Sequence, residues 1–328
     1  ISANTNACKA MASGDYIALL DHDDMLAPNA LFEVMKQIDE GADFIYTDEE
    51  VFEGDILNPV AIHFKPDYAP DTLSSINYIC HLTIIKKTLF DRIGDFDSEC
   101  DGSQDYDIIL RATEKAQKIV HIPKVLYYWR NHADSVSADI SVKPYCITSA
   151  IKALDKRFIE GKAEKIENTV SCYRIKYDII DEPKVSIIVV ASSTQKDLLR
   201  CLNSIKAKNT YKNIEIIVAD IQREVQANDE ICSRFENILH VKYNGKFKTS
   251  AVCNNAAKKA SGEYLLFIDA CNMILTEGFV EEMLMYAQRD NTGTVGGKLY
   301  SGKKIFSEMG EMLFTHFGMS GPMVLSAS

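Results

Sequence analysis

Residues 13–24 read Ser-Gly-Asp-Tyr-Ile-Ala-Leu-Leu-Asp-His-Asp-Asp, and this stretch indicates the class of fold. An Ala-rich helical segment precedes it and is expected to end with a C-cap at the Ser-Gly pair. An uncharged apolar run then occupies residues 16–20 and stops at Asp21. Such a run, without polar alternation, is typical of a strand buried on both faces of a parallel sheet. We therefore predict a helix, a turn and a buried strand that ends at an acid.

The pattern occurs twice in the chain. The matching residues keep one constant offset: Asn6, Ser13-Gly14-Asp15-Tyr16 and Asp21 in the first copy, and Asn254, Ser261-Gly262-Glu263-Tyr264 and Asp269 in the second. A Ser-Gly-acid-Tyr match could arise by chance, but the extra asparagine and aspartate at the same offset favour a duplicated domain.

A second domain is predicted to start between the copies. Residues 184–190 read as a buried strand, and the following helix has an apolar face with Leu198, Leu202 and Ile205. Residues 214–218 supply the next strand. Strand, helix and strand in this order form a parallel crossover, so we expect an α/β fold.

We expect four segments along the chain. They are part of a first domain in residues 1–133, a helical or linker segment in 134–183, part of a second domain in 184–305, and a tail of different character in 306–328. The Glu182-Pro183 pair favours a boundary there. The chain begins at Ile1 within a predicted helix, and we expect it to be a piece of a longer protein.

Composition excludes several classes of protein. The 328 residues include 36 Lys and Arg against 47 Asp and Glu, a net charge of −11, which argues against a nucleic-acid-binding protein. No stretch approaches the roughly 18 consecutive apolar residues of a membrane span, and no signal peptide is predicted. The nine cysteines form no Cys-x-x-Cys pair, so free thiols are expected rather than a zinc or redox site.

The acidic residues after the first strand carry the clearest chemical signal. Asp21 and Asp23 are two apart, so on an extended chain their side chains point the same way, at the sheet edge where α/β folds bind ligands. Converging carboxylates are oxygen ligands that suit Mg²⁺ or Mn²⁺. The alternative is a solvated acidic turn before the helix that starts near Pro28.

Four further motifs follow in order: Tyr46-Thr47-Asp48-Glu49, His63-Phe64-Lys65-Pro66-Asp67, Gly102-Ser103-Gln104-Asp105-Tyr106-Asp107 and Tyr128-Trp129-Arg130-Asn131-His132. With residues 2–24, they resemble the family 2 glycosyltransferases of the GT-A fold, a three-layer α/β/α architecture. The chain is most similar to two tandem partial domains of the bacterial enzymes that build O-antigens and other surface polysaccharides, often called rhamnosyltransferases. The resemblance covers nearly all of residues 1–305.

This resemblance implies an activity and a set of residue roles. The implied reaction is a metal-dependent, inverting transfer of a sugar from a nucleoside diphosphate to a growing surface polysaccharide or lipid-linked glycan. The implied roles are a base (Asp105), Mn²⁺ or Mg²⁺ ligands (Asp21, Asp23 and His132), donor contacts (Asn6, Asp21, Arg130 and His132) and acceptor-side contacts (Gln104, His63 and Lys65). The implied location is cytoplasmic, with peripheral association at the inner face of the plasma membrane left open.

Two of these roles also have a physical reading. Residues 106–115 read as a helix after a Gly-Ser turn, which places Asp105 at a helix N-terminus, where it either acts as a base or caps the helix. Arg130 suits planar pairing with phosphate, and the alternative for residues 129–132 is a surface loop. Gln104 stands where the family usually has Glu.

The second copy departs from the family pattern. Asp269-Ala270-Cys271-Asn272 stands where the first copy has its acidic turn, so the second carboxylate is missing. We expect a weak or lost second active site that serves as a scaffold or acceptor platform.

The tail resembles a different family. Residues 310–322 look like a motif of aminoacetone-oxidase-like FAD-binding flavoproteins, although the chain has no Gly-x-Gly-x-x-Gly motif. Two alternatives to an active glycosyltransferase therefore stay open: a non-catalytic module that binds a glycan or nucleotide, and a chimeric frame with a flavin oxidoreductase.

Overall fold

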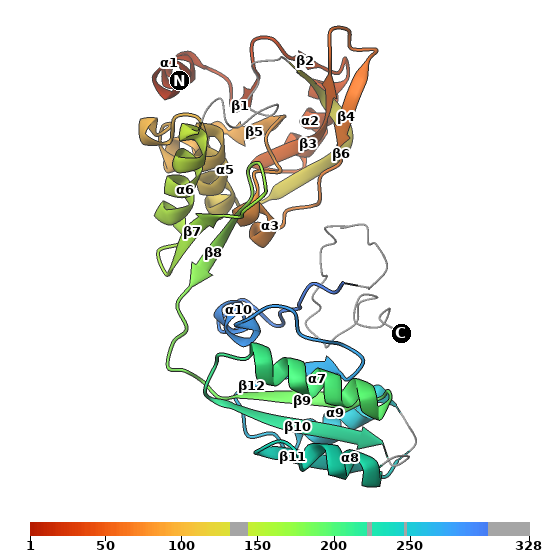
Figure 1. Ribbon diagram of the computed structural model, residues 1–328. Coiled ribbons are helices and arrows are strands. Elements are labelled where there is room, and N and C mark those ends of the chain that lie inside the picture. The colour runs from red at the N-terminus through yellow and green to blue at the C-terminus, as the bar shows by residue number, and fades with distance from the viewer. Residues whose placement is uncertain (132–143, 222–224, 246–247, 301–328) are drawn as a thin grey trace. The chain divides into compact units, whose positions relative to one another are not determined.

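The computed structural model describes residues 1–131, 144–221, 225–245 and 248–300, and it is shown in Figure 1. The chain forms two compact units, Ile1–Tyr177 and Asp178–Ser328. Each unit is α/β, as the sequence predicts. The expected divisions at residues 133 and 183 stay predictions, whereas the chain's own contacts divide it after Tyr177.

The first unit is built on a six-stranded mixed sheet. Its strands are β1 (Tyr16–Leu19), β2 (Met25–Leu26), β3 (Phe44–Phe52), β4 (Pro59–His63), β5 (Thr83–Lys86) and β6 (Ile119–Arg130). The order is β1-β5-β3-β6-β2, with β4 also paired to β3. Because β5 is antiparallel to both β1 and β3, it starts at the edge where β1 ends.

Helices cover both faces of this sheet. They are α1 (Ser2–Met11), α2 (Ala30–Asp39), α3 (Pro70–Ser75), α4 (Lys87–Ile93), α5 (Gln104–Lys115) and α6 (Tyr145–Arg157), with a short 3₁₀ helix at Ser98–Cys100. Alternate residues of β3 enter different cores, because Phe44 and Tyr46 pack with residues of α5 and α6, whereas Ile45 packs with residues of α2. This alternation gives the three layers expected for the fold.

The expected helical or linker segment packs onto the first unit. Its apolar period produces α6, whose Ala150 and Leu154 join the same core as Ile108 of α5. Strands β7 (Gly161–Lys165) and β8 (Tyr173–Tyr177) then form a two-stranded antiparallel sheet. Buried Tyr173 and Ile175 extend that core, so the segment adds a layer to the unit.

The second unit is a parallel sheet of order β11-β10-β9-β12. Its elements are β9 (Val185–Ala191), α7 (Gln195–Lys208), β10 (Ile214–Ile221), α8 (Val225–Cys232), β11 (Ile238–Tyr243), α9 (Thr249–Ala257), β12 (Tyr264–Asp269) and α10 (Phe279–Ala287). The predicted crossover is confirmed, because β9 and β10 are parallel neighbours joined by α7. The whole of β9 is buried, which agrees with a sequence that is apolar except for Ser186.

The predicted Ser-Gly C-caps are wrong. Helix α1 ends at Met11 and α9 at Ala257, before the Ser-Gly pair in each copy. Gly262 instead lies against β9, where an added Cβ would come within 2.5 Å of Ser186 Oγ and 2.6 Å of Ser186 N. The glycine is therefore needed for close backbone approach and not for a left-handed cap.

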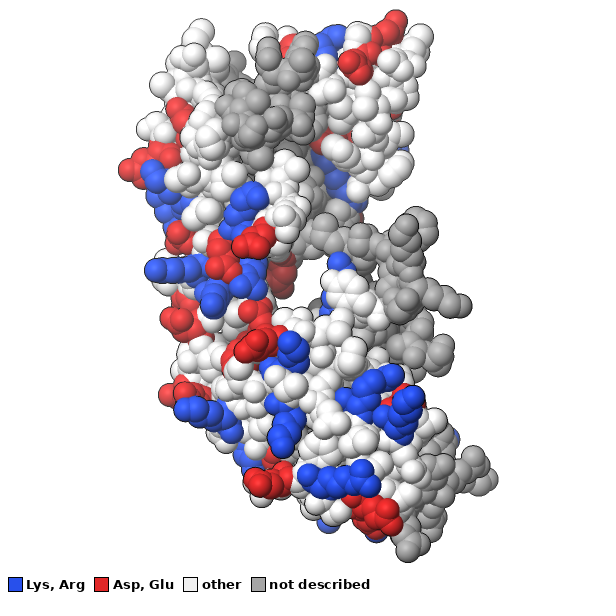
Figure 2. Space-filling model, viewed as in Figure 1, with Lys and Arg blue, Asp and Glu red and all other residues white. Residues whose placement is uncertain are grey.

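The described surface is mixed in charge. On the face shown in Figure 2, basic and acidic side chains are interspersed. Among the described helices, none is long and apolar enough to cross a membrane.

Candidate functional site

The register of the first sheet aligns several polar residues. Leu19 at the end of β1 pairs with Thr83, and Thr83 pairs with Tyr46 of β3. The residues just beyond this level are Asp21 after β1, His81 before β5, Asp48 and Glu49 on β3, and Tyr127, which is the partner of Glu49 on β6. Sheet geometry thus gathers these side chains at one edge.

Asp21, Asp24 and His81 form a candidate metal centre. One ligand atom from each lies within 4.8 Å of the others, and no other such group occurs among the residues that the structure describes. Two carboxylates and an imidazole suit a divalent cation, and the mixed oxygen and nitrogen set fits Mn²⁺ better than Mg²⁺. The residues present therefore fit the cation that the family resemblance implies.

Tyr127 of β6 binds the acidic turn, which we define as residues 21–24. Its hydroxyl donates to Asp24 Oδ2 at 2.5 Å and accepts from the backbone N–H of Asp21 at 3.3 Å. The backbone N–H of Arg130 donates to Asp24 Oδ1 at 2.8 Å. Burial raises the pKa of Asp24 and the charge of Asp21 adds to this effect, while the hydrogen bonds from Arg130 and Tyr127 and the charge of His81 oppose it.

The ligand role expected of Asp23 stays a prediction, and the cluster of Asp21, Asp24 and His81 does not include it. Its carboxylate lies 3.6 Å from the exposed ring of His22, while its carbonyl accepts a hydrogen bond from Arg130 Nε at 2.9 Å. It is Asp24 and His81 that join Asp21 in the cluster. The other expected ligand, His132, lies outside the described residues.

Arg130 ties the acidic turn to β3. Its guanidinium also donates to the carbonyl of Gly54 at 3.1 Å and lies over the ring of Phe52, 4.5 Å from the centroid. The expected donor role of Arg130 stays a prediction. The donor role of Asn6 also stays a prediction. Its side-chain amide donates to the carbonyl of Phe96 at 2.9 Å and accepts from the N–H of Phe96 at 2.8 Å, which ties α1 to the unit.

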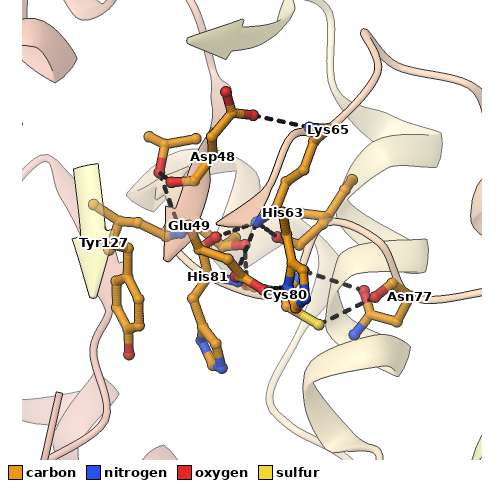
Figure 3. A network of polar contacts seen from close by, with 12 residues as sticks. Asp48, Glu49, His63, Lys65, Asn77, Cys80, His81 and Tyr127 are labelled. Carbon is orange, nitrogen blue, oxygen red and sulfur yellow. Dashed lines mark hydrogen bonds and ion pairs between the residues drawn. The ribbon is translucent and has the colours of Figure 1, made fainter. Parts of the chain in front are cut away.

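Aromatic rings enclose His81. Its imidazole stacks on Tyr127, with the centroids 4.8 Å apart, and meets Trp129 edge-on at 5.6 Å. The ring of Tyr127 thus supports one member of the cluster while its hydroxyl holds the other two. Figure 3 shows His81 and Tyr127 beside the buried polar network of β3.

Asp105 lies in the first turn of α5, as predicted. Asn77 Nδ2 donates to its Oδ2 at 2.9 Å. Burial raises the pKa of Asp105 and the charge of Asp21 adds to the rise, while His81 and backbone N–H groups at the helix start oppose it. Gln104 turns back instead, because its Oε1 accepts from the N–H of Gly102 at 2.8 Å.

The two remaining acceptor-side candidates flank Glu49. His63 Nδ1 lies 2.8 Å from Glu49 Oε1, and about half of the His63 side chain (47%) is exposed. Lys65 pairs with Glu49 Oε2 at 3.0 Å, and only 2% of its side chain is exposed. The acceptor-side roles of both residues stay predictions. The His63 side chain is accessible to a ligand from solvent, whereas the Lys65 side chain is buried.

The sequence analysis missed His81, Asn77, Asp24 and Tyr127. A signal was present, because residues 77–81 directly precede an apolar run that becomes β5. The direction of β5 in the sheet could not be predicted from this run. Because β5 is antiparallel to β1, its amino end, and not its carboxyl end, lies at the edge where β1 ends.

The corresponding edge of the second unit is arranged differently. Asp269 accepts from Ser192 Oγ at 2.7 Å and from the N–H of Cys271 at 2.9 Å. Asp220 is buried and accepts from Asn228 and His240, each at 3.0 Å. Asp269 is thus bound within the protein, whereas Asp220 is bound only at Oδ2, and its buried Oδ1 has no hydrogen-bond partner among the described residues. No carboxylate follows Asp269 at the positions of Asp23 and Asp24.

Comparison with known proteins decides the family. Residues 1–94 and 186–320 match the model of glycosyl transferase family 2, one segment in each copy of the repeat. The chain belongs to glycosyltransferase family 2. The match continues to residue 320, into the segment with the flavoprotein resemblance. That segment, residues 310–322, lies outside the described residues, and its resemblance to flavoproteins stays a prediction.

Relatives of this family 2 chain are longer proteins. An uncharacterized protein of Sinorhizobium fredii, y4gI, is 34% identical over 314 residues, which cover 92% of the chain and 34% of that protein. The O-antigen biosynthesis protein RfbC of Myxococcus xanthus is 28% identical over 302 residues, covering 90% of the chain and 24% of that protein. The chain thus spans about a third of the length of one of these relatives and about a quarter of the other.

Similarity to solved glycosyltransferases is weaker. Staphylococcus aureus TarS has a TM-score of 0.34 at 17% identity, covering 48% of this chain and 51% of that one. The mannosyltransferase PcManGT of Pyrobaculum calidifontis, solved with GDP-Man and Mn²⁺, has a TM-score of 0.32 at 17% identity and covers 34% of each chain. Family membership therefore rests on the sequence match.

Proposed function

We propose that the first unit catalyses a metal-dependent, inverting transfer of a sugar from a nucleoside diphosphate to a growing surface polysaccharide or lipid-linked glycan. The observation that carries this proposal is the convergence of Asp21, Asp24 and His81 at the sheet edge. The charges of Asp21 and His81 both affect the pKa of Asp105 at the start of α5, which supports a place for Asp105 near this cluster. Family membership supplies the reaction class, and RfbC, by its printed name an O-antigen biosynthesis protein, supports the class of acceptor.

Each residue has a defined task in the proposed reaction. A divalent cation held by Asp21, Asp24 and His81 would neutralise the charge that develops on the departing nucleoside diphosphate. Asp105 takes the proton from the acceptor hydroxyl, which then attacks the anomeric carbon opposite the leaving group, so the configuration inverts. Asn77 orients the Asp105 carboxylate through its hydrogen bond to Oδ2.

The second unit is proposed to be a scaffold or acceptor platform. What supports this is that Asp269 is bound by Ser192 and the N–H of Cys271, and Asp220 Oδ2 by Asn228 and His240. The proposal includes a cytoplasmic location with peripheral attachment to the inner face of the membrane, which fits a water-soluble donor and a lipid-linked acceptor.

A donor screen tests the proposed function. The chain is incubated with Mn²⁺ and a panel of nucleoside diphosphate sugars, with lipid-linked and free glycans as acceptors, and released nucleoside diphosphate is measured. We expect release that stops on addition of EDTA and is lost in Asp21→Asn and Asp105→Asn. Donor or glycan binding without turnover would indicate the non-catalytic module instead. Flavin absorbance in the purified protein would support the chimeric alternative.

A further inference from the structure

Lys65 is an ammonium enclosed in the core of the first unit. Only 2% of its side chain is exposed. Its Nζ donates to Glu49 Oε2 at 3.0 Å, to the carbonyl of Ile79 at 2.6 Å and to the carbonyl of His81. An ammonium has three N–H donors, so these contacts account for its full hydrogen-bonding capacity.

Glu49 holds the same segment from its other side. Its Oε2 accepts from the backbone N–H of His81 at 3.3 Å, and its Oε1 contacts His63 Nδ1 at 2.8 Å. Burial opposes ionisation of this carboxyl, but His63 and Lys65 outweigh that effect, and the pKa of Glu49 lies below its usual value. Both the N–H and the C=O of His81 are thus bound to one ion pair, as Figure 3 shows.

The Lys65–Glu49 ion pair is held by β3, an inner strand of the sheet. Glu49 lies on β3, between β4 and β6, and the backbone N–H of Lys65 donates to Asp48 Oδ1 at 2.9 Å. The ring of His81 reaches from this anchored backbone to the acidic turn, where it meets Asp21 and Asp24. Lys65 therefore contacts the candidate metal centre through the backbone carbonyl of His81, and the His81 ring carries this placement to Asp21 and Asp24.

We propose that Lys65 and Glu49 are positioning residues that fix the backbone of His81, so that its imidazole completes the cation site with Asp21 and Asp24. This inference rests on the proposed function, because it assumes that the cluster binds a divalent cation. A buried ion pair seldom adds more stability than apolar residues of similar size, so its fully bonded arrangement around His81 indicates a role in placement. Groups that orient metal ligands typically change metal affinity about 10–100-fold when they are removed.

The test is Mn²⁺ binding by the full chain, measured from the electron paramagnetic resonance signal of free Mn²⁺. Lys65→Met keeps the length of the side chain and removes its charge, and we expect the Mn²⁺ dissociation constant to rise by about tenfold or more. Lys65→Met with Glu49→Gln removes both charges together. It leaves no unpaired carboxylate and is expected to show the same weakening, in case the single variant does not fold.

Arg111→Met is the matched control. Arg111 is also a largely buried cation that binds one carboxylate, Asp107, and two carbonyls, those of Ile93 and Asp95, but it is not connected to His81. We expect its loss to lower the unfolding temperature while the Mn²⁺ dissociation constant stays within twofold of the parent value.

A double-mutant cycle separates positioning from general destabilisation. If Lys65 acts through His81, then Lys65→Met should not weaken Mn²⁺ binding further in a His81→Ala background. Independent, multiplying losses would overturn the inference, as would an unchanged dissociation constant in both Lys65 variants. Failure of the parent chain to bind Mn²⁺ would overturn the proposed cation site itself and the inference with it.

Discussion

At the scale of single residues, the site is organised by groups that sequence motifs do not single out. Asp21 was predicted at the sheet edge, but its partners Asp24 and His81 are selected by Tyr127, which holds the turn with its hydroxyl and supports the imidazole with its ring. The motif identifies which side chains are acidic, and the neighbouring strand decides which of them converge.

Tyr127→Phe isolates the contribution of that hydroxyl. The ring still stacks on His81, but Asp24 and the N–H of Asp21 lose a partner, so Mn²⁺ affinity should fall by about 10–100-fold. Stability should fall by roughly 1.5–3 kcal/mol, the usual effect of a hydrogen bond to a charged group. Mn²⁺ titration and urea unfolding measure the two effects. Tyr128→Phe, one residue along β6, is the control, and equal weakening in both variants would contradict the assignment.

Asp105→Asn should separate stability from activity. Burial raises the pKa of Asp105, so stability declines as the pH rises from the unfolded pKa, about 3.9 for aspartate, to the folded pKa and stays lower above it. The amide carries no charge, and the variant should unfold at a higher temperature near neutral pH while its turnover drops by about 10²–10⁴-fold. Calorimetry measures the unfolding temperature, and release of nucleoside diphosphate measures the turnover. A variant that is less stable at neutral pH would show that the carboxylate is not disfavoured in the fold.

At the scale of elements, several strands and helices were predictable, because buried parallel strands are rich in apolar residues and helices have an apolar face. Strands β1, β9, β10 and β12 and helices α6 and α7 lie at the residues where these patterns predicted them. The predicted burial of β1 in a parallel sheet is wrong, because β1 ends the strand order, pairs antiparallel with β5 and has no fully buried residue. Pairing direction was not predictable, because a short apolar run such as β5 has the same sequence character in either direction. The sequence therefore did not indicate that His81, in the segment before β5, lies beside Asp21 and Asp24.

Gly262→Ala tests the close approach between the turn before β12 and β9. The new Cβ would meet backbone and side-chain atoms of Ser186 and the carbonyl of Lys184, at 2.5 to 2.9 Å. Because backbone atoms cannot move aside easily, we expect a loss of about 1–3 kcal/mol in stability of the second unit. Gly293→Ala is the control, since an added Cβ there meets nothing within 4 Å. Equal stability of the two variants in urea would contradict the packing argument.

His240 of β11 should make the second unit sensitive to pH. Its ring lies between Asp220 of β10 and Asp229 of α8, and the hydrogen bond to Asp220 is the main cause of its raised pKa, opposed in part by burial. A raised pKa gives stabilisation that is complete below the unfolded pKa, about 6.5 for histidine, and that is lost as the pH rises through the folded pKa. Urea unfolding should therefore show a lower free energy of unfolding at pH 8 than at pH 6, and the difference should be smaller in His240→Gln. An equal difference in the variant would show that other groups cause the pH dependence.

At the scale of the whole molecule, one family 2 chain carries two copies of a related unit with different chemistry at equivalent positions. The first copy gathers two carboxylates and an imidazole, whereas in the second Asp269 is bound to Ser192 and to the N–H of Cys271. The repeat and the lost second carboxylate were readable from the sequence. The side chains that bind the remaining carboxylates came only from the tertiary structure.

The most direct test is the number of Mn²⁺ ions that the full chain binds, measured by electron paramagnetic resonance for the parent, Asp21→Asn and Asp269→Asn. We predict one ion per chain in the parent and in Asp269→Asn, and loss of binding in Asp21→Asn. Binding that survives Asp21→Asn, or that disappears in Asp269→Asn, would contradict the assignment of the cation site to Asp21, Asp24 and His81.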